Sequence, residues 1–131
     1  MTPSLDRVDH VHVFVTDREL AEQWYREVLG LSRMPALESW ASDGGPLTIA
    51  NEAGTIHLAL FERKAQPCRS TIAFGVTARE FMAWREHLSA ALEAPPKTED
   101  HQLSWSLYFT DPDGNPYEIT SCEYAAVEQL S

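Results

Sequence analysis

The chain has 131 residues, of which 44% are hydrophobic. This length allows one compact domain, or two small halves that share a core, and it requires neither disulfides nor a structural metal for folding. Ten Lys and Arg residues against twenty Asp and Glu residues give a formal net charge of −10, which argues against a nucleic-acid binder and against docking on anionic membranes. We therefore expect a small-molecule substrate or ligand as partner, with no nucleic acid and no membrane.

The sequence also predicts the compartment. No apolar run approaches the roughly 20 residues of a transmembrane helix, and the first residues, MTPSLDR, lack the charged and apolar segments of a signal peptide. The two cysteines, Cys68 and Cys122, form neither a close metal-binding pair nor a disulfide framework. We expect a reduced, soluble, cytoplasmic protein.

A strand, a helix and three more strands are predicted in the first half of the chain. Alternating apolar residues favour a strand over 9–15, and an apolar stripe at helical spacing favours a helix from about Asp17 to Leu29, ended by Gly30. The stripe consists of Leu20, Ala21, Trp24, Val28 and Leu29. Further strands are expected near 32–38, 46–51 and 55–62, with glycine turns at 44–45 and 53–54.

The second half predicts the same order of elements. A strand is expected over 70–76 and a helix from about Ala78 to Leu92. A short strand near 94–99 is interrupted by two prolines. The clearest strands are 103–109 and 115–121, and the sequence DPDGN between them suits a tight turn.

The two halves are also similar in sequence. Residues 10–20 (HVHVFVTDREL) match residues 71–81 (TIAFGVTAREF) at an offset of 61. At each strand-to-helix junction a Thr and a Glu fit a helix N-terminal capping box: Thr16 with Glu19, and Thr77 with Glu80. The repeat predicts an α+β fold of two βαβββ modules in one domain, with module one over about 8–62, a linker over about 63–69, module two over about 70–121 and a peripheral tail over 122–131.

The alternation assigns side chains to two faces of each predicted sheet. In the first strand the valines are expected to face the helix, which leaves His10, His12 and Phe14 on the other face. The same rule places His57 and Glu118 on that face of their strands. A face that mixes histidines, aromatic residues and a carboxylate is typical of the wall of a concave pocket.

The repeat also pairs these positions. At the offset of 61, Thr71 is the equivalent of His10, and Glu118 is the equivalent of His57. Three of these four residues are possible metal ligands. Two imidazoles and a carboxylate are the ligands of an open catalytic metal site or of a non-haem Fe(II) facial triad.

Three segments resemble the vicinal oxygen chelate superfamily: the strand DHVHVFVTD, the helix end WYREVLGL and the hairpin YFTDPDGNPYEIT. This group includes glyoxalase I, extradiol dioxygenases, fosfomycin-resistance enzymes and bleomycin-resistance binding proteins, and the resemblance covers about residues 8–121. It implies paired βαβββ modules whose sheets curl around a shared pocket. It also implies a homodimer, in which each pocket can take one module from each partner.

The resemblance further implies a ligand set on the first and last strands of each module. Carried over residue by residue, these positions are His10, His57, Thr71 and Glu118. Thr71 departs from the family pattern, which has a histidine there, and a hydroxyl is a poor ligand for Zn²⁺, Ni²⁺ or Fe²⁺. The implied cofactor is a divalent ion (Zn, Ni, Mn or Fe) held by His10, His57 and Glu118, or no metal at all. Glu118 is also the candidate catalytic base.

Each candidate ligand has a structural interpretation as well. His10 and His57 can be histidines that are hydrogen-bonded to their surroundings. Glu118 can be hydrogen-bonded to or ion-paired with His10, since a buried carboxylate without a partner is costly. His12 is expected as a pocket wall or substrate contact more than as a ligand.

Other residues are expected to line or cover the pocket rather than to react. The expected pocket residues are His12, Phe14, Thr71, His101, Trp105 and Tyr108, with Tyr124 and Trp40 as further candidates. Asp111 and Asp113 are assigned to the turn, His87 to the surface, and Trp24 and Trp84 to the core.

Two functions remain open from the sequence. The first is a glyoxalase- or dioxygenase-like enzyme that uses a divalent metal to chelate vicinal oxygens of a small metabolite, as a lyase, an isomerase or a ring-cleaving dioxygenase. The second is a metal-free protein, similar to the bleomycin-resistance group, that sequesters a cationic aromatic compound. The retained His10 and Glu118 favour the enzyme, whereas Thr71 and the charge of −10 favour the binding protein.

Overall fold

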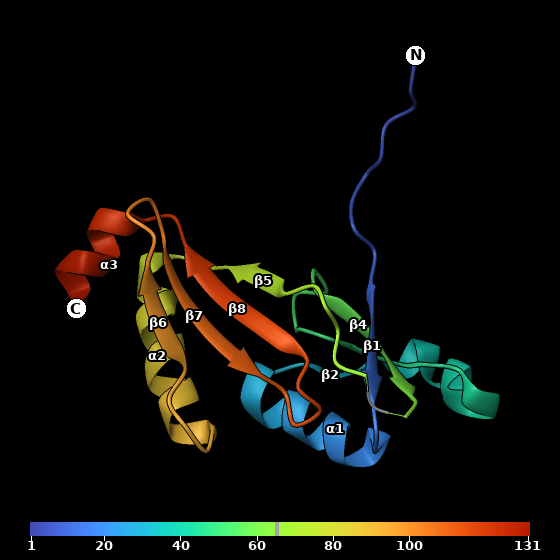
Figure 1. The fold of residues 1–131 in the computed structure, drawn as a ribbon. Helices are drawn as coiled ribbons and strands as arrows, with labels where there is room; N and C mark the ends of the chain where they lie inside the picture. The colour runs from blue at the N-terminus through green and yellow to red at the C-terminus, as the bar shows by residue number, and fades with distance from the viewer. Residues whose placement is uncertain (65) are drawn as a thin grey trace. The chain divides into compact units, whose positions relative to one another are not determined.

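The computed structural model describes residues 1–64 and 66–131. The chain divides into two compact units, Met1–Ala65 and Gln66–Ser131, and each unit contains a four-stranded sheet (Figure 1). In both sheets the first strand of the unit pairs in parallel with the last, and the remaining strands follow as antiparallel neighbours. The prediction of an α+β fold with two repeated βαβββ modules is confirmed.

The first unit has the strand order β1-β4-β3-β2. Its elements are β1 (Val11–Val15), α1 (Arg18–Trp24), a π-helical segment η1 (Tyr25–Leu29), β2 (Ser32–Arg33), a 3-10 helix η2 (Pro35–Gly44), β3 (Leu47–Ala50) and β4 (His57–Glu62). The residues before β1 are exposed, and the N-terminal end of this segment extends away from the sheet (Figure 1).

The expected strand over 32–38 is wrong beyond Arg33. Pro35 begins η2, which continues to Gly44, and the preceding Met34 is extended with φ −89° and ψ 108°. Proline has a fixed φ and no N–H group, so it suits the first turn of a helix and cannot donate to a strand ladder. For this reason the ladder with β3 consists of Ser32 and Arg33, and the Met34 N–H adds one more hydrogen bond, of 2.9 Å, to the Thr48 carbonyl oxygen.

The first capping box is also wrong. Asp17, not Thr16, is the N-cap of α1, and its carboxylate accepts a hydrogen bond of 3.1 Å from the Leu20 N–H. An Asp caps at least as well as a Thr and also places negative charge at the positive end of the helix. Leu20, expected in the buried stripe, is 66% exposed, and Tyr25 is fully buried instead.

The second unit has the strand order β5-β8-β7-β6. Its elements are β5 (Ile72–Gly75), α2 (Ala78–Ala91), β6 (Lys97–Asp100), β7 (Trp105–Thr110), β8 (Pro116–Ser121) and α3 (Tyr124–Leu130). Here the predicted capping box is confirmed, because the Thr77 hydroxyl accepts from the Glu80 N–H and the Glu80 carboxylate accepts from the Thr77 N–H, both at 3.2 Å.

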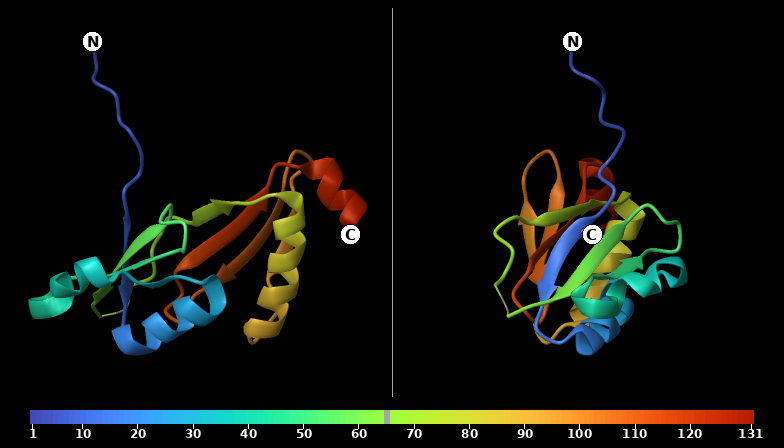
Figure 2. Two further views of the ribbon diagram at one scale, coloured as in Figure 1. Left: turned by 180° about the vertical axis from the view of Figure 1, so that it is seen from behind. Right: turned by 90° about the vertical axis from the view of Figure 1, so that its right-hand side faces the viewer.

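The residues after Glu123 are not a peripheral tail. They form α3, which packs against α2 (Figure 2) and buries Val127 to 1% exposure. The Glu123 carboxylate accepts a hydrogen bond of 3.0 Å from the Ala78 N–H and so satisfies a donor in the first turn of α2. The C-terminal segment therefore contributes to the core of the second unit.

The two modules differ in the register of their parallel strands. Val11 pairs with Leu58 in the first unit, but its equivalent Ile72 pairs with Tyr117 in the second. The offset of 61 would require Ile119 at that place. The prediction that Glu118 is equivalent to His57 is therefore wrong in register: Glu118 pairs with Ala73, as Ala59 pairs with His12 in the first unit.

The DPDGN turn forms as predicted. Gly114 donates its N–H to the Asp111 carbonyl at 3.0 Å and has a φ of +86°, which favours glycine. The buried Asp111 carboxylate accepts hydrogen bonds from the Asp113 and Asn115 backbone N–H groups and from the Asn115 side chain. Asp111 thus has a structural role, as expected. Among the described residues, no helix is long and apolar enough to cross a membrane.

Candidate functional site

His12 and Phe14 lie on the exposed face of β1. β1 runs parallel to β4 and pairs His12 with Ala59 and Phe14 with Phe61. The intervening Val13 and Val15 are at most 1% exposed, whereas Phe14 is 42% exposed. The predicted alternation is therefore correct for this strand: the valines enter the core, and the histidine and aromatic residues share the opposite face.

Asp9 contacts two histidines at once. Its Oδ2 lies 2.8 Å from Nδ1 of His10, and its backbone oxygen lies 3.1 Å from Nδ1 of His57. The hydrogen bond from His10 lowers the pKa of Asp9, against the effect of desolvation, and the charge of Arg7 acts in the same direction. An ionised carboxylate and a carbonyl oxygen only accept hydrogen bonds, so both rings donate from Nδ1. In their neutral forms, both therefore keep a lone pair on Nε2.

His12 extends this group of histidines. Its Nε2 lies 3.1 Å from Nε2 of His10, and the two rings are nearly parallel, with an interplanar angle of 20°. Phe61 packs against the His12 ring with centroids 4.7 Å apart, and Phe14 meets Phe61 edge-on at 6.0 Å. We call Asp9, His10, His12 and His57 the histidine cluster; Phe61 and Phe14 border it.

Glu118 is half-buried on β8 in the second unit. The fully buried Ser106 hydroxyl donates to its Oε2 at 2.6 Å and lies 3.0 Å from Oγ1 of Thr120. Thr120 in turn donates to the Trp105 carbonyl oxygen at 3.2 Å. Within this unit, a serine therefore supplies the hydrogen bond that a half-buried carboxylate requires.

Tyr108 lies next to Glu118 on the neighbouring strand. The two residues are direct cross-strand partners of β7 and β8. Burial raises the pKa of the Tyr108 hydroxyl, and the negative charge of Glu118 raises it further, because both disfavour the phenolate. The same hydroxyl lies 2.9 Å from Nε2 of His101, an exposed residue of the loop before β7. We call Ser106, Tyr108, Glu118 and Thr120 the carboxylate cluster.

The remaining expected pocket residues have different surroundings. Trp105 stacks on Tyr124 with centroids 5.5 Å apart, and Tyr124 donates to Oδ2 of Asp100 at 2.8 Å. In the described part of the chain, Trp105 Nε1 is buried without a hydrogen-bond partner. Thr71 is exposed just before β5, and Trp40 is 56% exposed on η2.

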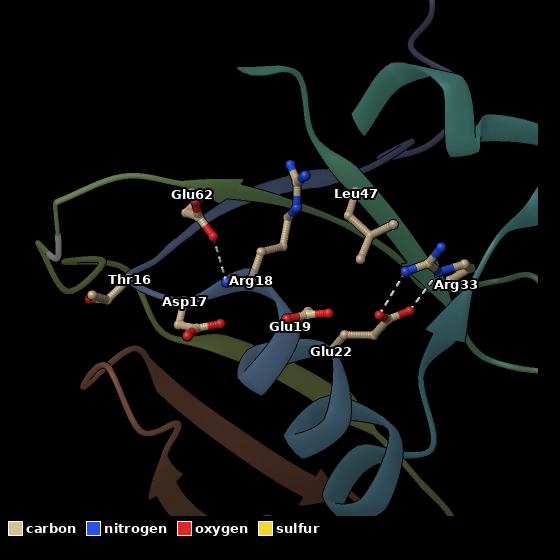
Figure 3. A pocket seen from close by; sticks show the side chains of 8 residues that line it. All are labelled: Thr16, Asp17, Arg18, Glu19, Glu22, Arg33, Leu47 and Glu62. Carbon is tan, nitrogen blue, oxygen red and sulfur yellow. Dashed lines mark hydrogen bonds and ion pairs between the residues drawn. The ribbon is translucent and has the colours of Figure 1, made fainter. Parts of the chain in front are cut away.

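A hollow of about 480 Å³ lies elsewhere in the first unit, at the N-terminus of α1 (Figure 3). Its two arginines are already paired: Arg33 forms a two-pronged contact with Glu22 at 2.7 and 2.8 Å, and Arg18 donates to backbone carbonyls of Ala41 and Gly45. The Arg33 guanidinium lowers the pKa of Glu22. These contacts connect α1 to β2 and η2, and the hollow contains none of the predicted site residues.

The structure thus groups the predicted residues within units. In the first unit, Asp9 contacts His10 and His57, and His12 contacts His10. In the second unit, Tyr108 lies between His101 and its cross-strand partner Glu118. Over the described residues, neither unit by itself brings three His, Cys, Asp or Glu side chains together in an arrangement that could hold a metal ion.

Sequence reasoning missed Asp9 and Ser106. Asp9 directly precedes His10, and a carboxylate next to a candidate ligand is a usable signal for an orienting partner. Ser106 lies two residues before Tyr108 on a strand, which places both on the same face. Its contact with Glu118, however, depends on the pairing of Ser106 with Thr120 across β7 and β8.

Residues 7–119 match the Glyoxalase/Bleomycin resistance protein/Dioxygenase superfamily. The match covers most of the chain, and the chain belongs to this family. This confirms the resemblance inferred from the sequence. A search of curated proteins finds no match.

Solved structures share this fold. An integron cassette protein from the Halifax Harbour sewage outfall metagenome is 23% identical, with a TM-score of 0.72 over 89% of this chain and 99% of that one. A putative glyoxalase family protein from Bacillus anthracis is 21% identical, with a TM-score of 0.69 over 94% and 100% of the two chains. The fosfomycin resistance protein FosX from Listeria monocytogenes, solved with Mn(II) and sulfate, is 14% identical, with a TM-score of 0.68 over 97% and 98%.

Proposed function

We propose that this chain is a metal-dependent enzyme in which His10, His57 and Glu118 bind a divalent ion. The observation that carries the proposal is the double contact of Asp9 with Nδ1 of both histidines. Because both rings donate from Nδ1, the lone pairs on their Nε2 atoms can serve as metal ligands. Two imidazole nitrogens suit Zn²⁺, Ni²⁺ or Fe²⁺, and a carboxylate also suits the harder Mn²⁺. The donor set present in the chain therefore fits the proposed metal, and Thr71, which stands where the family pattern has a histidine, would supply no imidazole ligand.

The residues of this chain have distinct roles in the proposed enzyme. When bound, the ion supplies Lewis-acid stabilisation of charge that develops on two adjacent oxygens of a small metabolite. Asp9 orients the two imidazoles. Glu118 binds the ion or accepts a proton from the substrate, and Ser106 fixes one of its oxygens. Tyr108 is protonated near neutral pH, as an ordinary tyrosine is, and its raised pKa disfavours the phenolate further, so it is a hydrogen-bond donor next to Glu118.

The proposed reaction class is that of a lyase, an isomerase or a ring-cleaving dioxygenase in the cytoplasm. Membership of a superfamily whose name includes glyoxalases and dioxygenases supports it. The Mn(II) in the Listeria FosX structure supports a divalent ion. We further propose a homodimer. Light scattering at micromolar protein concentration should give twice the mass of 14.8 kDa, and a monomer would contradict the dimer.

Metal analysis of protein purified without chelator tests the enzyme. We expect near-stoichiometric divalent metal in the unaltered chain and a large loss in His10→Ala and in Glu118→Gln, because each removes one ligand. Leu103→Ala is a matched control, since Leu103 is 84% exposed and outside both clusters. Metal content that is unchanged in both ligand variants, or absent from the unaltered chain, would contradict the proposal.

One observation favours a metal-free binding protein as a second candidate. The Arg63 guanidinium lies 5.2 Å from the centroid of the Phe61 ring, so this aromatic face already accepts a cation. Phe14 and Phe61 would then stack with a cationic aromatic compound that the charge of −10 attracts. Calorimetric titration with such a compound should show binding without metal that is weakened in Phe61→Ala. Binding that requires added metal would exclude this function.

A further inference from the structure

We infer that His12 is a metal ligand and that His10 and His12 chelate one divalent ion through their Nε2 atoms. The inference rests on the proposed function in one respect, the use of His10 as a ligand. It adds a residue that the sequence assigned to the pocket wall. The chelate requires only β1 and the residues directly before it.

The geometry of the pair fits a shared ion. The two Nε2 atoms are 3.1 Å apart, whereas the ring centroids are 5.0 Å apart, so the rings converge at their Nε2 edges. With metal–nitrogen bonds of about 2.0–2.1 Å, two nitrogens at a right angle are about 2.9 Å apart, and two at the tetrahedral angle are about 3.4 Å apart. The observed distance lies between these values.

Both rings are held in place before any ion arrives. Nδ1 of His10 is hydrogen-bonded to the Asp9 carboxylate at 2.8 Å. The His12 ring packs on Phe61 at 4.7 Å, and His12 is fixed on the exposed face because it pairs with Ala59 of β4. Ligands whose conformations are already restricted lose less entropy on binding.

The proton balance of the pair also permits a metal. A contact of 3.1 Å between two Nε2 atoms requires one proton between them. Because His10 uses its proton at Nδ1 for Asp9, His12 carries the proton on Nε2. For a divalent ion to bind, this proton would pass through solvent to Nδ1 of His12, so that both Nε2 lone pairs would be available as ligands. No oxidant, reductant or other reactant is consumed.

Titration of the full chain with Ni²⁺ tests the chelate. Isothermal calorimetry should show one high-affinity ion per chain, and His12→Phe, which keeps an aromatic ring against Phe61 but removes both nitrogens, should weaken binding about 100-fold. His87→Ala, an exposed histidine on α2, is the matched control and should bind as the unaltered chain does. Far-ultraviolet circular dichroism shows whether each variant is folded.

Nuclear magnetic resonance supplies a readout that does not depend on affinity. Substoichiometric Cu²⁺ should broaden the ring signals of His10 and His12 first, while those of His87 and His101 persist.

Unchanged binding in His12→Phe, or no binding to the unaltered chain, would overturn the chelate. If His12→Phe binds normally while His10→Ala and Glu118→Gln lose the metal, the chelate fails and the proposed function stands. If Glu118→Gln alone binds normally, the chelate stands and the role of Glu118 fails.

Discussion

Helices α1 and α2 come from the same repeat but bury different positions. Leu20 and Phe81 are equivalent at the offset of 61, yet Leu20 is 66% exposed and Phe81 is fully buried. The difference begins at the caps: Asp17 caps α1, whereas Thr77, the equivalent of Thr16, caps α2. One residue corresponds to about 100° around a helix, so a later start and a π-helical continuation bring other side chains to the sheet. Similar sequences therefore preserved the order of elements but not the buried face.

The two units also differ in the chemistry of their exposed sheet faces. The first presents imidazole nitrogens that Asp9 orients, and the second presents the half-buried oxygens of Tyr108 and Glu118, with the buried Ser106 hydroxyl bonded to Glu118. Imidazole nitrogen suits borderline metals, whereas a carboxylate next to hydroxyl groups suits proton transfer as well as ligation. The two modules therefore share their order of strands but differ in the polar groups on these faces.

The largest expected effect concerns the equivalent helix positions. Phe81→Ala should lower the free energy of unfolding by about 3–5 kcal/mol, because it leaves a cavity in a core that buries the ring completely. Leu20→Ala should change it by less than about 0.5 kcal/mol, because that side chain is largely in water. Denaturant unfolding measures both. If both variants lose the same free energy of unfolding, the two helices bury equivalent positions after all.

The caps should give a smaller difference. Thr77→Ala removes the side-chain acceptor of the capping box and should cost about 1 kcal/mol, and Asp17→Ala should cost a similar amount. Thr16→Ala should cost less than Asp17→Ala, because Asp17 accepts the Leu20 N–H. Thermal unfolding of the three variants tests this order. If Thr16→Ala lowers stability more than Asp17→Ala does, Thr16 is the N-cap, as the sequence predicted.

The titration of Tyr108 tests the carboxylate cluster. Its raised pKa should appear in the ultraviolet absorbance as a tyrosine that ionises above the ordinary pH range, and Glu118→Gln should shift it back down by removing the neighbouring charge. Because the pKa of Tyr108 is raised in the folded protein, the stability that depends on its neutral hydroxyl is fully present below the ordinary Tyr pKa. It is lost as pH rises through the raised value. If the midpoint of the Tyr108 titration is the same in Glu118→Gln, the charge of Glu118 does not act on the Tyr108 hydroxyl.

The smallest effect is expected at the hollow of the first unit. Glu22→Gln weakens the pair with Arg33 and should cost less than about 1 kcal/mol, because Arg33 is 44% exposed and solvent screens the charges. The pKa of Glu22 is lowered in the folded protein. Its contribution is therefore present above the ordinary Glu pKa and lost as pH falls through the lowered value. Unfolding at low and high salt should show a larger cost for Glu22→Gln at low salt.

Local patterns predicted most of the fold. The strands of alternating residues, the helix at 78–92 and the DPDGN turn depend on neighbours within a few positions, and each formed near its expected place. The strand at 32–38 and the tail at 122–131 were wrong. Proline chemistry at Pro35 explains the first error. Packing of α3 against α2, which periodicity in a short polar segment does not indicate, explains the second.

The sequence by itself determined the repeat, the family and the residues to which we assign chemistry in the proposed function: His10, His12, His57 and Glu118. These features depend on residue type and spacing. Tertiary structure alone decided that Asp9 holds two histidines, that Ser106 holds Glu118, and that the second module pairs its parallel strands two residues out of step with the first. Contacts between strands far apart in sequence depend on register, and register follows from the packing of the whole unit, which spacing along one strand does not encode.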